Sequence, residues 1–237
     1  MVILDFGSGN TCKNDYEIIA EMYIKLARVV PPELREHFVV KWQLFLDEQP
    51  NVMLTDDAYI TAEAIGSWLG FKTTASAFDA KSIEFLMGSD IPFVKIANRT
   101  DLGKIAAHAE NSGAKVYQSV PDVNSFYLLK RRHPDRQPMC CISKYPAELV
   151  DYREMFTAEQ LSDAVSDHTV GMELYARYKP KIWEKHYVLE HDKDNPDAGA
   201  FAFTPEDVLQ FVERFVTYHG ASPMAFKSQR LPADKQE

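Results

Sequence analysis

Short hydrophobic runs alternate along the chain with longer stretches whose apolar side chains recur every three or four residues. The short runs predict β-strands, because buried parallel strands are apolar on both faces, and the longer stretches predict amphipathic helices. The predicted strands cover residues 2–6, 38–44, 71–78, 92–97, 115–120, 139–143, 164–167 and 181–189.

Helical patterns fill the intervals between these strands. They cover residues 15–30, 56–69, 80–87, 101–111, 152–163 and 170–178, and residues 121–138 predict a mixture of helix and loop. The last helix has the clearest start, with Thr204 as its cap, Pro205 at its first position and Glu206 and Asp207 in its first turn. Gly220 is its predicted end.

The alternation of eight strands with up to eight helices predicts parallel strand pairing. Eight such units in about 240 residues fit a closed (β/α)8 TIM barrel, which is an α/β fold. We therefore predict one barrel domain over residues 1–220 and a C-terminal tail over 221–237. A doubly wound open sheet is the alternative, because alternation does not show closure. Gly7-Ser8-Gly9 lacks the third glycine of a dinucleotide-binding loop.

Composition narrows the class of protein. The chain is 46% hydrophobic and 26% charged, as expected of a folded soluble protein, and its net charge of −9 argues against nucleic acid as the main partner. No apolar run approaches the roughly 20 residues of a membrane-spanning helix. The start of the chain lacks the basic residues of a signal peptide, and the three cysteines are an odd number. We expect a cytoplasmic protein without a membrane partner.

Two lysines interrupt strands that are otherwise apolar. In a TIM barrel the active site lies at the carboxyl ends of the strands, where Lys41 and Lys95 fall. A buried ammonium without a negative partner costs several kcal/mol. The phosphate or carboxylate of a ligand would provide that partner, with Ser76, Ser143 and Ser166 as neutral hydrogen-bond donors. The alternative is that each lysine pairs with an acidic residue or extends to solvent.

Two histidines lie at the ends of the seventh and eighth predicted strands. These strands are neighbours in a closed barrel, so His168 and His186 should converge. Two imidazoles can hold a divalent metal and leave coordination positions for water and substrate. Asp5, across the barrel closure, could add a carboxylate. Histidines with purely structural hydrogen bonds are the alternative.

Several segments at these strand ends carry a resemblance that covers nearly the whole chain. They are Val40-Lys41-Trp42-Gln43, Ser76-Ala77-Phe78-Asp79, Pro92-Phe93-Val94-Lys95-Ile96, Tyr145-Pro146, Ser166-Asp167-His168-Thr169, Glu184-Lys185-His186 and Asn195-Pro196-Asp197. In this order they resemble the sialic acid synthase family. Each segment is weak alone, whereas Ser-Asp-His-Thr together with Glu-Lys-His is fairly specific.

The resemblance implies a function. It implies an aldol-type condensation of phosphoenolpyruvate with an N-acetylated amino sugar such as N-acetylmannosamine, with release of phosphate. It also implies a divalent metal, Mn²⁺ or Mg²⁺, on His168 and His186. The residues implied for phosphoenolpyruvate are Lys41, Gln43, Ser76, Lys95, Asn98, Ser143 and Ser166, and the catalytic and sugar-contacting positions are Asp5, Tyr145 and Asp197.

The chain also departs from that family. Thr100 stands where the family usually has a glutamate, Asp5 replaces a longer glutamate, and Asn98 replaces a common serine. The family's C-terminal antifreeze-like domain, which supplies an arginine to the partner subunit's sugar site, has no counterpart in these residues. A homodimer and a separate protein that supplies this domain are our partner hypotheses. The functional alternatives are another metal-dependent aldol or lyase reaction, and a non-catalytic barrel that binds a sugar or a protein.

Overall fold

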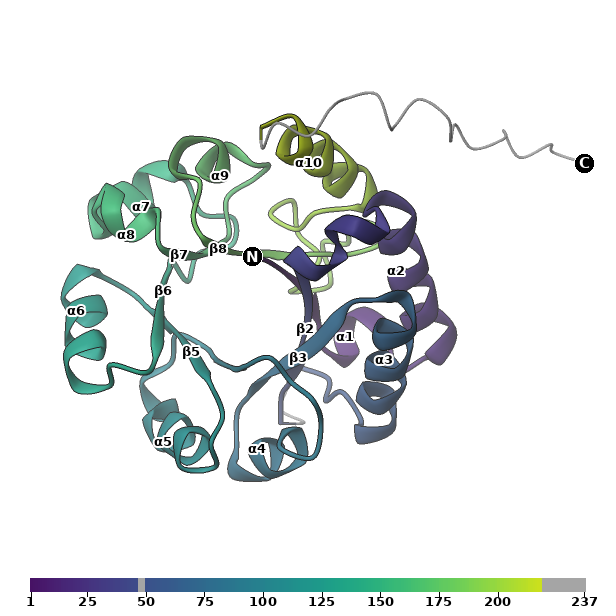
Figure 1. The fold of residues 1–237 in the computed structure, drawn as a ribbon, viewed down its shortest axis with the longest axis horizontal. Coiled ribbons are helices and arrows are strands. Elements are labelled where there is room, and N and C mark those ends of the chain that lie inside the picture. Colours follow the sequence, from purple (N-terminus) through teal and green to yellow (C-terminus); the bar gives the residue numbers. More distant parts are fainter. Residues whose placement is uncertain (47–49, 219–237) are drawn as a thin grey trace, which may run out of the picture.

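Eight parallel strands close into a barrel in chain order, and β8 completes the ring beside β1 (Figure 1). This computed structural model describes the backbone of residues 1–46 and 50–218, with side chains to residue 214. The strands are β1 (Val2–Gly7), β2 (Phe38–Leu44), β3 (Lys72–Ala77), β4 (Val94–Ile96), β5 (Val116–Val120), β6 (Gln137–Cys141), β7 (Ala164–Asp167) and β8 (Ile182–His186). The predicted TIM barrel is confirmed, and the open sheet is excluded.

Helices surround the ring of strands (Figure 1). They are α1 (Gly9–Cys12), α2 (Tyr16–Val29), η1 (Pro32–His37), α3 (Asp56–Leu69), α4 (Ala80–Leu86), η2 (Thr100–Leu102), α5 (Gly103–Asn111), α6 (Val123–Arg132), α7 (Leu149–Met155), α8 (Ala158–Leu161), α9 (Glu173–Tyr178) and α10 (Pro205–Tyr218). Within the described residues, no helix has the length and apolar character needed to span a bilayer.

The helix predicted over residues 152–163 is wrong in one respect, because it is two short helices. Phe156 takes an extended backbone conformation after α7, and the hydroxyl of Thr157 then caps α8 by accepting the Gln160 N–H. The short helix α1 was not predicted either. The mixture predicted over residues 121–138 is α6 followed by the start of β6.

The start of α10 is as predicted. The Asp207 carboxylate accepts the Thr204 N–H at 2.9 Å, and the Thr204 hydroxyl accepts the Asp207 N–H at 3.4 Å. These reciprocal bonds satisfy backbone donors that the first turn leaves unpaired. The predicted end at Gly220 and the tail over 221–237 lie outside the described residues.

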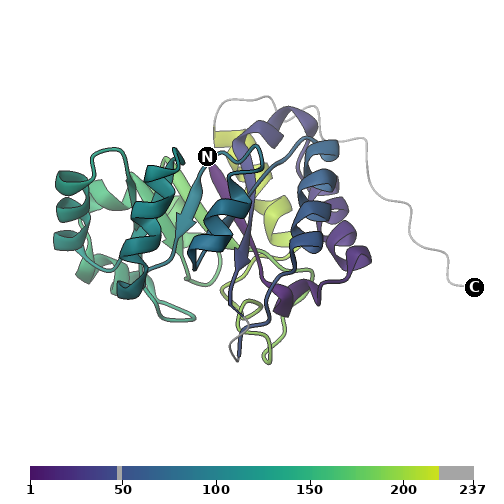
Figure 2. The same ribbon diagram turned by 90° about the horizontal axis from the view of Figure 1, so that it is seen from below.

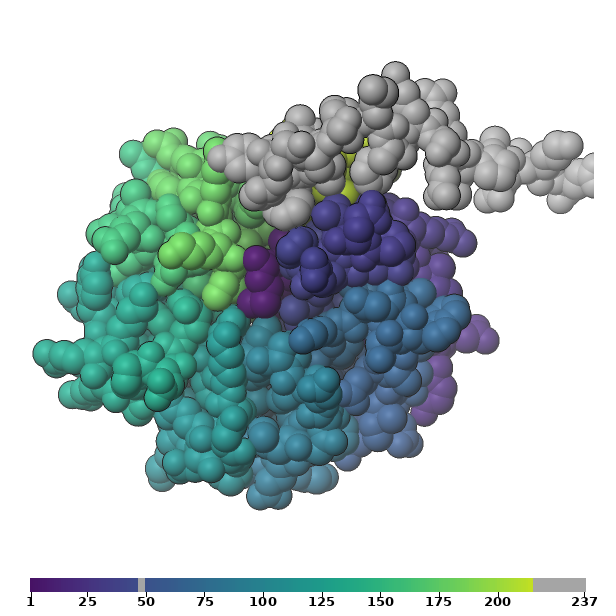
Figure 3. All heavy atoms as spheres, viewed as in Figure 1, coloured from purple at the N-terminus to yellow at the C-terminus, as the bar shows by residue number. Residues whose placement is uncertain are grey.

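The barrel interior has an apolar layer near the amino ends of the strands, which we call the plug. It consists of Ile3, Val39, Phe93, Tyr117, Met139 and Ala164. The rings of Phe93 and Tyr117 stack with centroids 4.2 Å apart. On the face from which the amino terminus emerges, side chains fill the centre of the ring (Figure 3).

A second interior layer follows two residues further along the strands, because side chains of a strand return to the same face with a period of two. This polar layer consists of Asp5, Lys41, Ser76, Lys95, Ser119, Ser166 and Glu184, all of them buried. The intervening residues, such as Leu4 and Val40, point outward into the main apolar core. Figure 2 shows the molecule from the side, with the amino terminus at one end of the barrel and the segment between β8 and α10 at the other.

Candidate active site

A cavity of about 610 Å³ opens above the polar layer, at the carboxyl ends of the strands. All the site residues predicted from the sequence line it. They are Asp5, Lys41, Gln43, Ser76, Lys95, Asn98, Ser143, Tyr145, Ser166, His168, His186 and Asp197. The structure therefore brings these twelve side chains together. The exposed Thr100 does not belong to the cavity lining.

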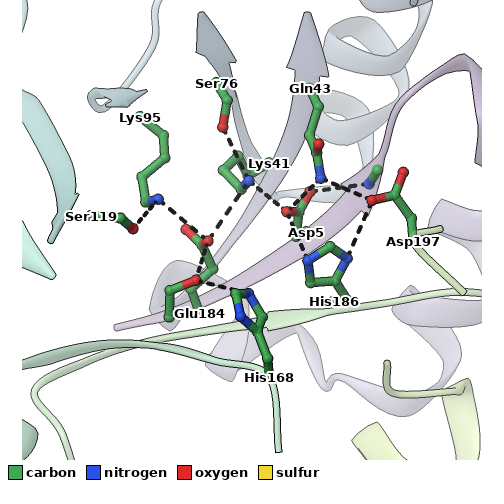
Figure 4. A network of polar contacts seen from close by, with 12 residues as sticks. Asp5, Lys41, Gln43, Ser76, Lys95, Ser119, His168, Glu184, His186 and Asp197 are labelled. Carbon is green, nitrogen blue, oxygen red and sulfur yellow. Dashed lines mark hydrogen bonds and ion pairs between the residues drawn. The ribbon is translucent and has the colours of Figure 1, made fainter. Parts of the chain in front are cut away.

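The two lysines lie in the floor of this cavity, each 3% exposed, and pair with acidic residues of the chain (Figure 4). Lys41 Nζ donates to Asp5 Oδ2 at 2.6 Å and to Ser76 Oγ at 3.1 Å. Lys95 Nζ lies 3.6 Å from Glu184 Oε1, and Lys41 Nζ lies 3.8 Å from the same oxygen. The sequence left open whether a ligand anion or an acidic residue of the chain neutralises these lysines. The structure shows acidic residues, so burial of the lysines does not by itself require a ligand.

The ion pair between Lys41 and Asp5 keeps both of these groups charged. Burial alone would lower the pKa of Lys41, but Asp5 and Glu184 more than offset it, so that this pKa is raised. Burial alone would raise the pKa of Asp5, but Lys41 and His186 more than offset it, so that this pKa is lowered. Each ammonium has three N–H donors. In the described part of the chain Lys95 uses one of them in a hydrogen bond, to Ser119 Oγ at 2.8 Å.

Glu184 links the lysines to the rest of the site, although the sequence assigned it no role. Its Oε1 accepts the Ser166 hydroxyl at 2.9 Å, and its Oε2 is buried without a hydrogen-bond partner among the described residues. The signal that could have identified it is its place on β8 two residues before His186, which puts both side chains on the same face.

The two histidines converge as predicted, with ring centroids 5.5 Å apart. The Nδ1 of His168 donates to the Ile142 carbonyl oxygen at 2.7 Å, which leaves Nε2 with the lone pair. Burial lowers the pKa of His168 to about 3, so its ring is neutral at physiological pH. His186 Nε2 lies 3.6 Å from Asp5, and its Nδ1 lies 3.6 Å from Asp197.

A tyrosine hydroxyl fixes the backbone that carries His168. Tyr152 of α7 is fully buried, and its hydroxyl donates to the Ser166 carbonyl at 2.6 Å and accepts the His168 N–H at 3.0 Å. These two bonds hold the end of β7 on both sides of residue 167. The helix that carries Tyr152, α7, therefore positions the end of β7 that bears His168.

The ring nitrogen atoms of His168 and His186 are the candidate ligands for a divalent metal ion. Within residues 1–46 and 50–214, no three His, Cys, Asp or Glu side chains form a ready-made metal site. His168 is nevertheless neutral, with its Nδ1–H bonded to a carbonyl, which is the state of a metal-binding histidine. His186 Nδ1 is buried and has no hydrogen-bond partner among the described residues. The pair fits a divalent ion whose other ligands are water and substrate oxygens.

The outer part of the cavity contains the residues implied for the sugar. The ring of Tyr145 lies on that of His168, with centroids 4.2 Å apart, and its side chain is half-exposed. Asp197 accepts the Gln43 amide at 3.2 Å, and burial raises its pKa. Gly7, at φ +76°, lets this carboxylate approach, because a Cβ there would lie 2.8 Å from Asp197 Oδ2.

Sequence comparisons identify relatives of the chain. The sequence model of the NeuB family matches residues 41–223, which is well over half of the chain. The N-acetylneuraminate-9-phosphate synthase of Drosophila melanogaster is 26% identical over 159 residues. That alignment covers 60% of this chain and 42% of the relative, so the chain spans about two fifths of the curated protein it matches.

Solved structures share the barrel. The N-acetylneuraminic acid synthetase of Leptospira borgpetersenii, in complex with citrate, gives a TM-score of 0.70 at 18% identity, over 98% of this chain and 87% of that one. The spore coat polysaccharide biosynthesis protein spsE of Bacillus subtilis gives 0.71 at 14% identity, over 93% and 70%. At these identities the likeness shows the fold alone. The match to the family model confirms the resemblance seen at the strand ends: the chain belongs to the NeuB family.

Proposed function

We propose that the protein condenses phosphoenolpyruvate with the open-chain aldehyde of an N-acetylated amino sugar and releases phosphate. The observation that carries the proposal is the position of two buried ammonium groups beside a pair of converging histidines in one cavity. Phosphoenolpyruvate is a small anion, and the sugar aldehyde needs a group that polarises its oxygen. The family and the names of the relatives agree with this reaction class.

The proposed reaction forms one C–C bond and breaks one C–O bond, with water as the third reactant. The C3 carbon of phosphoenolpyruvate attacks the aldehyde carbon to form the new C–C bond, and the aldehyde oxygen takes up a proton. Water then adds at C2, the bond between C2 and the bridging oxygen breaks, and phosphate leaves. The product is a 2-keto acid with a longer carbon chain.

The polar layer would bind the anion. Lys41 and Lys95 supply charge-assisted hydrogen bonds to the phosphate and carboxylate, and Ser76, whose oxygen accepts from Lys41, supplies a neutral donor beside them. The Ser166 hydroxyl donates to Glu184, so it would have to turn toward the anion to supply a second neutral donor. Because Glu184 already lies between both lysines, it would fix the two ammonium groups at a set spacing before the substrate arrives. Preorganisation of this kind reduces the reorganisation that binding requires.

The outer residues would bind and orient the sugar. Tyr145 offers an aromatic face beside His168, and Asp197 offers a carboxylate to sugar hydroxyls. His168 and His186 would hold a divalent ion, which when bound supplies Lewis-acid polarisation of the aldehyde oxygen. Of the two candidate metals the histidine pair favours Mn²⁺, since Mg²⁺ prefers oxygen ligands. We also propose a cytoplasmic location and a homodimer.

The experiment that tests the function measures phosphate release from phosphoenolpyruvate with Mn²⁺, across a panel of aldoses that includes N-acetylmannosamine. Release that requires both the metal and one particular sugar would support the proposal and name the acceptor. Binding of phosphoenolpyruvate without release would indicate an acceptor outside the panel. Absence of both binding and release would leave the alternative of a barrel that serves recognition only.

A further inference from the structure

Phe201, in the segment between β8 and α10, contacts both histidines of the site. Its ring centroid lies 5.0 Å from that of His186 and 6.2 Å from that of His168, and both pairs are nearly perpendicular, at 83° and 78°. The ring is 3% exposed and lines the cavity. In the described part of the chain Phe201 does not belong to any of the apolar core clusters. Its ring contacts are with Tyr145 and the two histidines, all of which line the cavity.

The two histidines differ in how their rings are held. The ring of His168 is anchored by the 2.7 Å hydrogen bond to the Ile142 carbonyl. The ring nitrogens of His186 lie 3.6 Å from the nearest carboxylate oxygens of Asp5 and Asp197, which is beyond hydrogen-bond distance. These carboxylates lie within ion-pair distance but form no hydrogen bond that would fix the ring, so packing contributes to its orientation. Among the aromatic and histidine rings around His186, that of Phe201 is the nearest.

Gly199 provides the room for the Phe201 ring. A Cβ at Gly199 would lie 2.6 Å and 2.9 Å from two carbons of that ring, and the third nearest atom also belongs to Phe201. The backbone of Gly199 is not in the left-handed region, so its conformation does not require glycine. The glycine is required only because the Phe201 ring occupies the space that a side chain would take.

We propose that Phe201 is a positioning residue that fixes the imidazole of His186. Gly199 leaves the space that the Phe201 ring occupies. The metal-binding part of this inference rests on the proposed function, in which His186 holds a divalent ion. Residues that orient a metal ligand typically change metal affinity by about 10–100-fold when they are removed. Phe201 orients its histidine by ring packing, whereas Ile142 orients His168 by a hydrogen bond.

The test compares Phe201→Ala and Gly199→Ala with the control Gly103→Ala. We expect each of the first two to raise the Kd for Mn²⁺, measured by electron paramagnetic resonance, about 10-fold or more. The Kd for phosphoenolpyruvate without metal should change less than about twofold, because the lysines are not disturbed. A Cβ at Gly103 would meet no atom within 4 Å, so its variant should match the parent in both affinities.

The double variant sharpens the assignment. The three atoms nearest to a Cβ at Gly199 all belong to Phe201, so Gly199→Ala should add nothing to Phe201→Ala. Additive losses would overturn the claim that Gly199 acts through this ring. If Phe201→Ala lowers the thermal midpoint severely, Phe201→Leu, which keeps most of the volume, provides the same comparison.

A metal-free measurement separates this inference from the proposed function. Three-bond NMR couplings report the χ1 rotamer of His186 and do not respond to the loss of a neighbouring ring current. We expect rotamer averaging at His186, but not at His168, in metal-free Phe201→Ala and Gly199→Ala. If the parent fails to bind Mn²⁺ but this averaging is present, the metal assignment fails and the positioning role stands. Unchanged couplings at His186 would overturn the positioning role.

Discussion

The plug and the polar layer are built by the same strands two residues apart, yet they have opposite chemistry. Along β1 and its neighbour β2, Ile3 precedes Asp5 and Val39 precedes Lys41. The plug stabilises the barrel by burial of apolar surface and close packing. The polar layer contributes little to stability, because the attraction within buried ion pairs is largely offset by their desolvation. The comparison teaches that the apolar contacts that stabilise the barrel and the polar groups of the candidate site are separated along the barrel axis.

The polar layer and the histidines above it contain buried polar atoms that a ligand could bind, and the plug has none. In the described residues Glu184 Oε2 and His186 Nδ1 are buried without hydrogen-bond partners. An unsatisfied buried polar atom costs about 1–3 kcal/mol, so a ligand that satisfies it recovers that free energy on binding. The plug has no such atoms among its six side chains, and changes there should act on folding alone.

The largest effect is expected at the histidines. His168→Ala and His186→Ala should each remove measurable Mn²⁺ binding while the barrel stays folded, because the plug and outer core are untouched. Electron paramagnetic resonance measures the free metal, and thermal unfolding checks the fold. His133→Ala, at a partly exposed position outside the cavity, serves as the control. Parent-like Mn²⁺ affinity in either site variant would show that the ligand assignment is wrong.

The lysines come next. Lys41→Ala and Lys95→Ala should weaken phosphoenolpyruvate binding by about 2–5 kcal/mol and spare the metal, since each removes one partner of a buried charged contact. Isothermal calorimetry measures both affinities. The control is Lys144→Ala, which removes a half-exposed ion pair with Asp151 outside the cavity. Unchanged affinity in both site variants would remove the argument for an anion pocket.

Phe93→Ala tests the plug directly. It should lower the free energy of unfolding by about 3–5 kcal/mol, because it leaves a cavity and removes the stack with Tyr117. The Kd for phosphoenolpyruvate should stay within about twofold of the parent. Urea unfolding and calorimetry give the two numbers. A loss of affinity as large as that of the lysine variants would mean that the two layers are not separable.

The smallest effect is expected for a change that keeps volume. Met139→Leu in the plug should cost less than about 1.5 kcal/mol in urea unfolding, since Met139 is fully buried and makes only apolar contacts in its cluster. Phosphoenolpyruvate and Mn²⁺ affinities should equal those of the parent. A larger cost would show that the plug depends on shape as well as on volume.

Much of the fold could be predicted from the sequence, because buried parallel strands are continuous hydrophobic runs and α10 carries its cap at Thr204. The break at Phe156 escaped prediction, since the apolar pattern continues across it and only the cap at Thr157 signals a new helix. Lys41 and Lys95 could be singled out as charges inside apolar strands. Their partner Glu184 was given no role, although it shares a face of β8 with His186, because its contacts with both lysines exist only in the closed barrel.

The position of Phe201 could not be predicted from hydrophobic periodicity at all. It lies in an irregular segment, where no periodicity indicates which way a side chain points. Its contact with His186, 15 residues earlier in the chain, follows from how the segment folds back over the barrel. The resemblance to the family suggested metal-binding roles for the two histidines, but it did not indicate which residues orient their rings.

The plug has a kinetic consequence for the proposed reaction. With the amino end of the barrel filled, substrates must enter and leave the cavity from its carboxyl end. The lysines lie in the floor, 3% exposed, while Tyr145 is 52% exposed nearer the mouth. A sugar held at Tyr145 would obstruct the path of the anion, so binding should be ordered, with phosphoenolpyruvate first. Initial-rate kinetics with a dead-end sugar analogue should then show inhibition that is uncompetitive with phosphoenolpyruvate.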